Sequence, residues 1–93
     1  MNFDLRFSDQ FLKHYNSLIK KDSQLKQRVK KTIELLETNP YYPSLHTHKV
    51  FIDELGEVLS SRVSGDIRII WTFDKNNRLI LILLEIGGHN EVY

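Results

Sequence analysis

Residues 86–93, IGGHNEVY, place a histidine and a tyrosine four residues apart, directly after an apolar run. If one helical turn joins them, His89 and Tyr93 become neighbours, because positions i and i+4 share a helix face. An imidazole can act as general acid or base near neutral pH, and a tyrosine can stack on a nucleobase or hydrogen-bond a phosphate. Taken singly, such a histidine is more often a surface or capping residue, and such a tyrosine a terminal anchor.

Arg62 and Arg68 flank a turn-forming sequence, residues 64–66 (SGD). A three-residue loop would pair Val63 with Ile67 and set the two arginines opposite each other. A two-residue turn would put them on opposite faces, and the sequence leaves both possibilities open. Facing guanidinium groups repel unless an anion lies between them, and a phosphate matches their fork of donors. The more common role of such arginines is on a solvent-facing strand surface.

His46 and His48 lie in residues 39–50, a segment that also holds both prolines. Two histidines two residues apart, with no cysteine and no carboxylate cluster nearby, are a weak metal signal. We therefore expect no metal site. The sequence has no glycine-rich phosphate loop and no hydrolase signature, so nothing favours an ordinary small-molecule enzyme.

Composition excludes several classes of protein. The 93 residues predict a single domain, residues 1–93, and the absence of cysteine excludes disulfides, cysteine-based zinc sites and thiol nucleophiles. No apolar run approaches the ~20 residues of a membrane helix, and the N-terminus is unlike a signal peptide, so we expect a cytoplasmic protein without membrane contact.

Charge is unevenly distributed along the chain. Residues 1–50 carry nine basic and five acidic residues, whereas residues 51–93 carry four and seven. The formal net charge is only +1, so the chain is not a polycation that coats nucleic acid non-specifically. Any RNA or DNA binding must come from a local basic surface.

Hydrophobic periodicity predicts the order β-α-α-β-β-β. Residues 2–7 alternate apolar and polar side chains, which is typical of a strand with one buried face. Two amphipathic helices follow, the first capped by Ser8 or Asp9, the second by Asp22 or Ser23 and ending near Thr38. Three more strands are predicted over residues 58–63, 67–73 and 79–86, with a loop over 39–50 and a linker over 51–57.

These elements predict an α+β fold, a helical hairpin packed on a small, mostly antiparallel sheet. Residues 79–86 are apolar on both faces, so their strand should lie inside the sheet with the helices on one side. The N-terminal strand should join an edge of the sheet. Trp71, on a hydrophobic strand, should belong to the core.

The order of elements, the length and several local strings resemble the RelE/ParE superfamily of type II toxin–antitoxin toxins. SRVSGDIRIIWTF resembles the central hairpin of that family, LILLEIGGHNEVY resembles its last strand and C-terminal segment, and LHTHKV occupies its loop before the sheet. The ending is most similar to the RelE and YafQ-like branch, which cleaves mRNA in the ribosomal A site. The resemblance implies a ribosome-dependent mRNA endonuclease that uses no metal or other cofactor, and a flexible antitoxin that wraps it.

The resemblance also implies catalytic roles. His89 matches the C-terminal histidine of the YafQ type, a candidate general acid or base, and Tyr93 matches the C-terminal aromatic residue that contacts a base or the phosphate. His48 matches a loop histidine of that subgroup, and either histidine could be the acid or the base. Arg68 matches the arginine that holds the scissile phosphate, and Arg62 stands where the subgroup has a second histidine.

Three more residues complete the implied site. Asp66 matches a hairpin aspartate, and Lys49 together with His46 is expected to contact the RNA backbone. The chain also departs from the family, because RelE toxins carry lysines on the strand where this chain has residues 59–61, LSS. The site thus combines the patterns of two subgroups.

Two other functions fit the same family. One is a gyrase inhibitor of the ParE type, which shares the fold but needs no cluster of histidines and arginines. The other is an inactive family member that only binds an antitoxin. DNA breaks, mRNA breaks and growth arrest distinguish the three.

Overall fold

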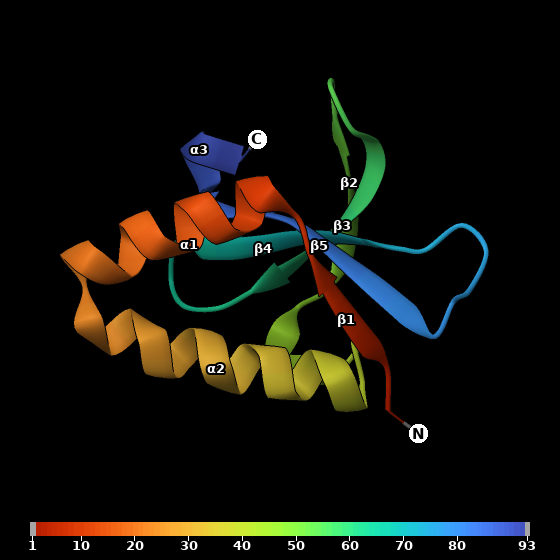
Figure 1. Cartoon of the computed structure of the whole chain (residues 1–93), viewed down its shortest axis with the longest axis horizontal. Coiled ribbons are helices and arrows are strands. Elements are labelled where there is room, and N and C mark those ends of the chain that lie inside the picture. The colour runs from red at the N-terminus through yellow and green to blue at the C-terminus, as the bar shows by residue number, and fades with distance from the viewer. Residues whose placement is uncertain (1, 93) are drawn as a thin grey trace.

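Five strands form one sheet, and two helices run antiparallel along one side of it (Figure 1). The computed structural model describes residues 2–92. Its elements, in chain order, are β1 (Asp4–Phe7), α1 (Asp9–Lys21), α2 (Ser23–Thr38), the 3₁₀ turn η1 (Pro43–Leu45), β2 (His48–Ile52), β3 (Gly56–Arg62), β4 (Ile67–Phe73), β5 (Ile80–Gly88) and α3 (His89–Val92). The predicted α+β class is confirmed.

The helical hairpin is held by side-chain caps at the predicted positions. Ser8 Oγ accepts the Phe11 amide proton at 3.0 Å and donates to the Leu84 carbonyl at 2.9 Å, so it starts α1 and ties it to β5. Asp22 joins the two helices without a loop. Its amide donates to the Leu18 carbonyl at the end of α1, and its carboxylate accepts from the Gln24 amide at the start of α2.

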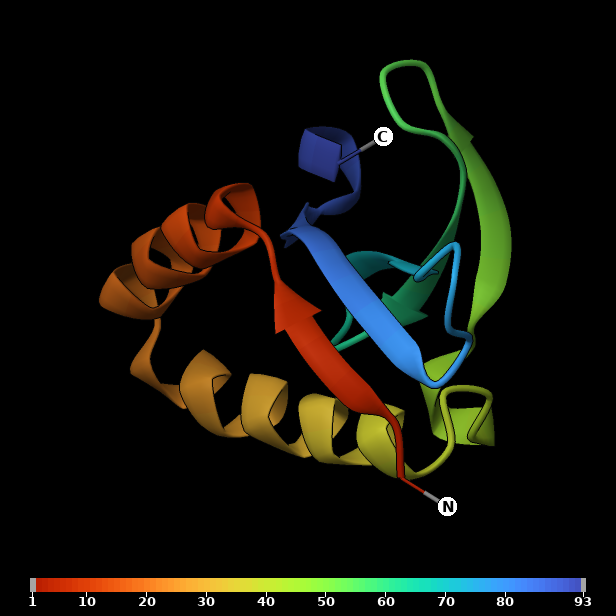
Figure 2. The ribbon, with the colours of Figure 1, turned by 45° about the vertical axis from the view of Figure 1, so that its right-hand side comes forward.

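The strand order is β1-β5-β4-β3-β2, and every pair is antiparallel except β1 with β5. The apolar strand β5 lies inside the sheet and β1 lies at an edge, as predicted. Figure 2 shows β1 alongside β5, with the helices on one side and the β2–β3 hairpin on the other.

The predicted loop and linker are wrong over part of their length, because residues 48–52 form β2 and β3 begins at Gly56. Only Val50 and Ile52 of β2 pack inward, while Phe51 on the other face is 73% exposed. A strand at a sheet edge needs few buried side chains, so its apolar pattern is too short to be recognised. The turn between β2 and β3 uses Gly56 at φ +81°, a left-handed conformation that favours glycine.

Two apolar clusters lie on opposite faces of the sheet. The larger lies under the helices and contains Phe11, Val29, Leu36, Ile69, Leu83 and the fully buried Trp71, which confirms the predicted core position of the tryptophan. The smaller contains Val58, Ile70 and Val92, so α3 covers part of the other face. Phe7, which the β1 alternation places inward, is instead 40% exposed.

A chain of hydrogen bonds crosses the larger core. Trp71 Nε1 donates to Ser61 Oγ at 2.8 Å, Ser61 Oγ lies 2.6 Å from Thr47 Oγ1, and Thr47 Oγ1 donates to the Pro40 carbonyl at 2.7 Å. A carbonyl only accepts and a hydroxyl has one proton, so Ser61 donates to Thr47 and the chain runs in one direction. It fastens the segment before β2 to the sheet. None of the helices within residues 2–92 has the length and hydropathy that crossing a membrane requires.

Replacing Ser61 by alanine leaves the buried indole N–H of Trp71 without its acceptor. We expect Ser61→Ala to lower the free energy of unfolding by about 1–3 kcal/mol, the penalty for an unsatisfied buried polar group. Urea denaturation followed by the fluorescence of the single tryptophan measures this directly. The exposed Ser17→Ala on α1 is the control and should unfold like the wild type; equal stability of both variants contradicts the role of the chain.

Candidate active site

The β3–β4 hairpin sets two arginines side by side. The Val63 amide donates to the Ile67 carbonyl at 2.9 Å, and Arg62 pairs directly with Arg68, so residues 64–66 form the three-residue loop. Directly opposite residues point to the same face, with Cβ atoms about 4.5–5.5 Å apart. Within residues 2–92 no carboxylate forms an ion pair with either guanidinium group. The pair is therefore a concentrated positive charge on one sheet face.

His48 lies on the same face. It pairs with Ser60 across β2 and β3, and Ser60 is two residues before Arg62, so His48 and Arg62 are diagonal neighbours, typically about 7–8 Å apart. His48 Nδ1 lies 2.9 Å from the carbonyl of His46, which stands in the left-handed region at φ +48°. Because a carbonyl only accepts, Nδ1 carries the proton, and Nε2 is the basic nitrogen of the neutral ring. His46 thereby orients His48.

Two glycines bring α3 against this face. Gly87 pairs with Arg68, so β5 ends beside the arginines. A Cβ on Gly88 would lie 2.7 Å from Asp66 Oδ2, and one on Gly87 would lie 3.2 Å from Val92 Cγ1. Neither glycine has positive φ, so their role is to leave space for close contact.

Asp66 and Glu91 cap the short helix α3. Asp66 Oδ1 accepts the His89 amide proton at 3.3 Å, and Glu91 Oε1 accepts the Gly88 amide proton at 2.8 Å. The second contact is half of a capping box, with glutamate at the third helical position. Asp66 therefore positions α3, and its catalytic role stays a prediction. Glu91 is absent from the predicted site, although its spacing from Gly88 is the sequence signal of such a cap.

Val92 fixes α3 on the sheet. Its side chain is 6% exposed and packs with Val58 and Ile70, whereas His89 is exposed at the start of the turn. The predicted helical turn after the glycines is thus confirmed for residues 89–92. Tyr93 lies outside the described residues, so its predicted place beside His89 stays a prediction.

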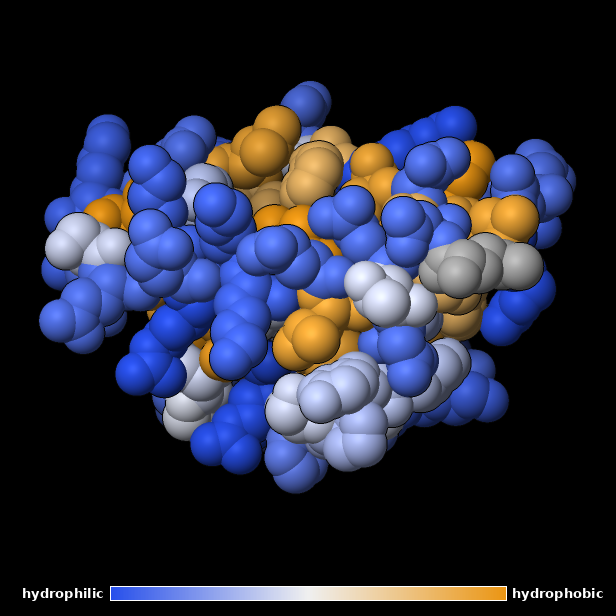
Figure 3. Space-filling view, turned by 90° about the horizontal axis from the view of Figure 1, so that it is seen from below, coloured by the Kyte–Doolittle hydropathy of each residue, from blue (hydrophilic) through white to orange (hydrophobic). Residues whose placement is uncertain are grey.

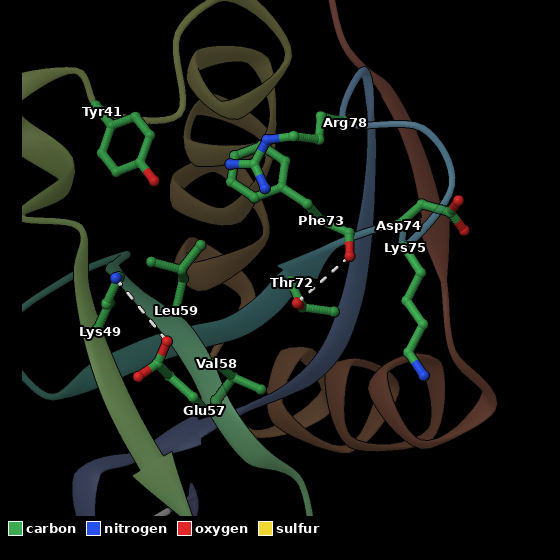
Figure 4. Close-up of a pocket in the computed structure, with 10 residues that line it drawn as sticks. All are labelled: Tyr41, Lys49, Glu57, Val58, Leu59, Thr72, Phe73, Asp74, Lys75 and Arg78. Atoms are coloured by element: carbon green, nitrogen blue, oxygen red, sulfur yellow. Dashed lines mark hydrogen bonds and ion pairs between the residues drawn. The ribbon is translucent and has the colours of Figure 1, made fainter.

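Lys49 lies away from this group, although it follows His48 directly. Successive strand residues point to opposite faces, and Lys49 forms an exposed ion pair with Glu57 at 3.9 Å. It lines a hollow of about 330 Å³ in which Tyr41 stands at the rim and the guanidinium of Arg78 lies 4.1 Å over the ring of Phe73 (Figure 4). Its predicted RNA contact is therefore separate from the site face.

The hydrogen bond between His14 and Glu85 is absent from the sequence predictions. His14 of α1 contacts the carboxylate of Glu85, which also accepts the Ile86 amide proton at 3.0 Å. Glu85 lies where β4 and β5 shift register. The sequence feature that could have indicated this contact is Glu85, a single acidic residue inside an apolar strand. Within residues 2–92, no three histidine, aspartate or glutamate side chains gather closely enough to bind a metal.

The site is an open sheet face formed by β2, the β3–β4 hairpin and α3. His48, Arg62, Asp66 and His89 are exposed, and Arg68 is partly buried. By sequence, the chain matches no protein-family model and no curated protein.

Solved structures do match it. YafQ from E. coli strain BL21(DE3) has a TM-score of 0.76 at 19% identity, with 98% of both chains covered. The YoeB/ParE toxin from Agrobacterium tumefaciens has a TM-score of 0.75 at 11% identity, covering 94% of this chain and 99% of the other. A chain of the archaeal RelE–RelB complex from Pyrococcus horikoshii OT3 has a TM-score of 0.72 at 18% identity, covering 95% and 96%.

The chain has the fold of the RelE, YafQ and YoeB toxins. The sequence resemblance implies lysines over residues 59–61, but Ser60 and Ser61 of this chain are completely buried. A cation at position 61 would break the hydrogen bond that Ser61 accepts from Trp71. The positive charge of this site instead comes from Arg62 and Arg68 at the hairpin.

The contact between Asp66 and α3 predicts a difference between two substitutions. Asp66→Ala removes the acceptor of the His89 amide, and we expect that amide to exchange its hydrogen with solvent faster. Asp66→Asn retains an acceptor oxygen and should protect the amide more nearly like the wild type. Hydrogen exchange measured by NMR tests this, with Asp53→Ala in the β2–β3 turn as control; identical exchange in all variants contradicts the capping role.

Proposed function

We propose that the protein is the toxin of a type II toxin–antitoxin system and that it cleaves mRNA on the ribosome. The observation that carries this proposal is the direct pairing of Arg62 with Arg68 on the sheet face that also holds His48 and α3. The RelE-like fold supports it.

The chemistry is attack of a ribose 2′-OH on the neighbouring phosphate. A base takes the proton of the hydroxyl, the 2′-oxygen bonds to phosphorus, and the bond from phosphorus to the 5′-oxygen breaks. An acid protonates the 5′-oxygen as it leaves. One product then ends in a 2′,3′-cyclic phosphate and the other in a 5′-hydroxyl. The basic Nε2 of His48 suits the first step, and we assign the second to His89.

The arginine pair stabilises the charge that develops on the phosphate. Two guanidinium groups on one face repel each other without an anion, and a pentacovalent phosphate with extra negative charge relieves that repulsion most. Arg62 and Arg68 therefore stabilise the transition state more than they stabilise the bound substrate. Tyr93, placed next to α3 by sequence, would contact the base or the phosphate.

The open site accounts for dependence on the ribosome. A side chain on an exposed face is screened by water and cannot hold a flexible RNA in line for attack. A ribosome with mRNA in its decoding site supplies the missing orientation. The protein would thus have three partners, namely the ribosome, translated mRNA and an antitoxin.

The antitoxin is proposed as a flexible protein that wraps the toxin. The archaeal structure of similar fold is a RelE–RelB complex, which supports a partner of this kind. A helix of four residues held by Val92, Asp66 and Glu91 is a weakly anchored element. Covering or displacing it would disable His89 without unfolding the sheet.

The first test is expression without the antitoxin, with primer extension on a reporter mRNA. We expect cuts within translated codons for the wild type and a loss of about 10²–10⁴-fold for His89→Ala, the usual contribution of a general acid or base. Asn90→Ala, the exposed neighbour on the same turn, should cleave like the wild type. Growth arrest with intact mRNA would instead indicate gyrase inhibition, and no arrest would indicate an antitoxin-binding module.

The arginine pair predicts opposite effects on activity and stability. Arg68→Met keeps the apolar stem and removes the charge, so ribosome-dependent cleavage should fall by roughly 10²–10³-fold. The free energy of unfolding should stay equal or rise by about 0.2–1 kcal/mol, because the facing like charges no longer repel. Lys75→Met, which removes an exposed cation from the hollow of Figure 4, is the control and should match the wild type. If Arg68→Met lowers the free energy of unfolding but leaves cleavage unchanged, the assigned role of the arginine pair is refuted.

A further inference from the structure

Strand β5 contains one residue more than its partner β4 over the length in which the two strands pair. Residues 81–83 pair with residues 71–73, and residues 85–88 pair with residues 67–70, so Leu84 is an extra residue between the two stretches. Such a β-bulge bends the strand and moves every later side chain to the face opposite the one that simple alternation would give. The bulge in β5 therefore decides which of its residues face the candidate site.

The bulge places a glycine, rather than a larger residue, beside Arg68. Gly87 lies opposite Arg68, while Ile86 packs in the core under the helices. If the pairing of the first half of β5 continued unchanged, Ile86 would instead lie opposite Arg68. Glu85 would then point into the core opposite Ile69, where an unpaired carboxylate is costly. A Cβ on Gly87 would lie 3.2 Å from a side chain of α3, so an isoleucine in this place would collide with that helix.

Groups at the start of α1 and within it hold the bulge. Ser8, the residue before α1, donates from Oγ to the Leu84 carbonyl at 2.9 Å. Nδ1 of His14, further along α1, contacts the Glu85 carboxylate. A carboxylate only accepts, so Nδ1 carries the proton of this hydrogen bond. The same carboxylate accepts the Ile86 amide proton at 3.0 Å, so His14 holds a side chain that is itself tied to the backbone after the bulge.

The bulge also lies next to α3. Leu84 packs against the small apolar cluster that contains Val92 of α3. A hollow of about 90 Å³ lies between α1, β5 and α3, and His14, Glu85, Glu91 and Val92 are among the residues that line it. Figure 1 shows α1 and α3 at the same end of β5. A change at the bulge therefore alters the surface on which α3 rests.

We propose that His14 is a positioning residue of the candidate site, an inference whose consequence for cleavage rests on the proposed function. By holding Glu85 at the bulge, His14 keeps Gly87 beside Arg68, and α3 packs against that glycine with His89 at its start. His14 acts through the strand and not on the RNA itself. Proton transfer depends on the placement of the acid within hydrogen-bond reach, so a displaced α3 lowers the rate of the chemical step.

The test removes the donor of this contact and compares that change with a conservative change of the acceptor. His14→Ala deletes the donor, whereas Glu85→Gln retains an acceptor oxygen for the His14 ring. Val29→Ala is the control for stability, because it shortens a buried side chain of α2 and should cost at least as much folding free energy. Helix α2 lies across the molecule from α3 (Figure 1), on the mostly hydrophilic side seen in Figure 3.

Two measurements are made on each variant. NMR of the free protein follows the amide chemical shifts of residues 84–89 and the cross-strand nuclear Overhauser effects between Gly87 and Arg68. Cleavage of a reporter mRNA on purified ribosomes gives kcat and the KM for ribosomes. The first measurement reports the position of the strand end without reference to any activity, and the second reports its consequence for the reaction.

We expect His14→Ala to shift the signals of residues 84–89, to weaken the Gly87–Arg68 effects and to lower kcat by roughly 2–10-fold, the range that one hydrogen bond supplies. The KM should stay unchanged, because both arginines of the pair remain on β3 and β4. Glu85→Gln should resemble the wild type in both measurements. Val29→Ala should keep the Gly87–Arg68 effects and the wild-type kcat.

The remaining outcomes separate this inference from the proposed function. Wild-type spectra of His14→Ala over residues 84–89 would overturn the inference, as would a loss of kcat that Val29→Ala shares, since ordinary loss of stability would then explain it. Shifted spectra with an unchanged kcat would overturn the role of His14 in the reaction. A wild-type protein that leaves mRNA intact would refute the proposed function, while the spectra would still decide whether His14 positions α3.

Discussion

The register between β3 and β4 fixes which face each side chain of the hairpin occupies. Arg62 pairs with Arg68 and Ser61 pairs with Ile69, so both arginines point to the open face while Ser61 reaches Trp71 under the helices. A slip of one residue would exchange the two faces. A slip of β3 would turn the Arg62 guanidinium toward the helices and take Ser61 away from the indole of Trp71. The same hydrogen bonds therefore determine both the core and the candidate site.

The two faces of the sheet are covered to different extents. The helical hairpin seals one face with a large apolar cluster, and α3 with Val92 covers only part of the other. The open face accommodates unfavourable features, namely two facing arginines and a short helix that starts at an exposed histidine. The stability of the covered face makes these features tolerable, because folding free energy is shared by the whole small domain.

Local patterns predicted the helices, their caps and the three apolar strands, because capping and periodicity depend on neighbouring residues. The sequence did not predict strand β2, because an edge strand with only two inward residues shows little hydrophobic periodicity. The hydrogen bonds of Ser61 with Trp71 and Thr47 were also beyond prediction, since they join distant segments. The candidate site divides in the same way. The resemblance supplied the residue types, and the register brought His48, Arg62 and Arg68 to one face.

Lys49 follows His48 in the sequence but points to the opposite face of the sheet, because successive strand residues alternate; its RNA contact stays a prediction. Asp66 positions α3 by accepting the His89 amide proton. The sequence could not reveal this role, because it depends on α3 lying next to the β3–β4 loop. Both cases show that a side chain's neighbours in space follow from the pairing of strands rather than from its neighbours in the chain.

The pairing of β1 with β5 has a consequence for synthesis of the protein. Asp4 to Phe7 find their partners only at residues 80–83, and α1 rests on the same strand. During translation the helical hairpin therefore emerges long before the surface that covers its apolar side. Contacts this distant along the chain slow folding. A nascent chain cannot present the complete candidate site, because β5, its two glycines and α3 follow every other described element in the order of synthesis.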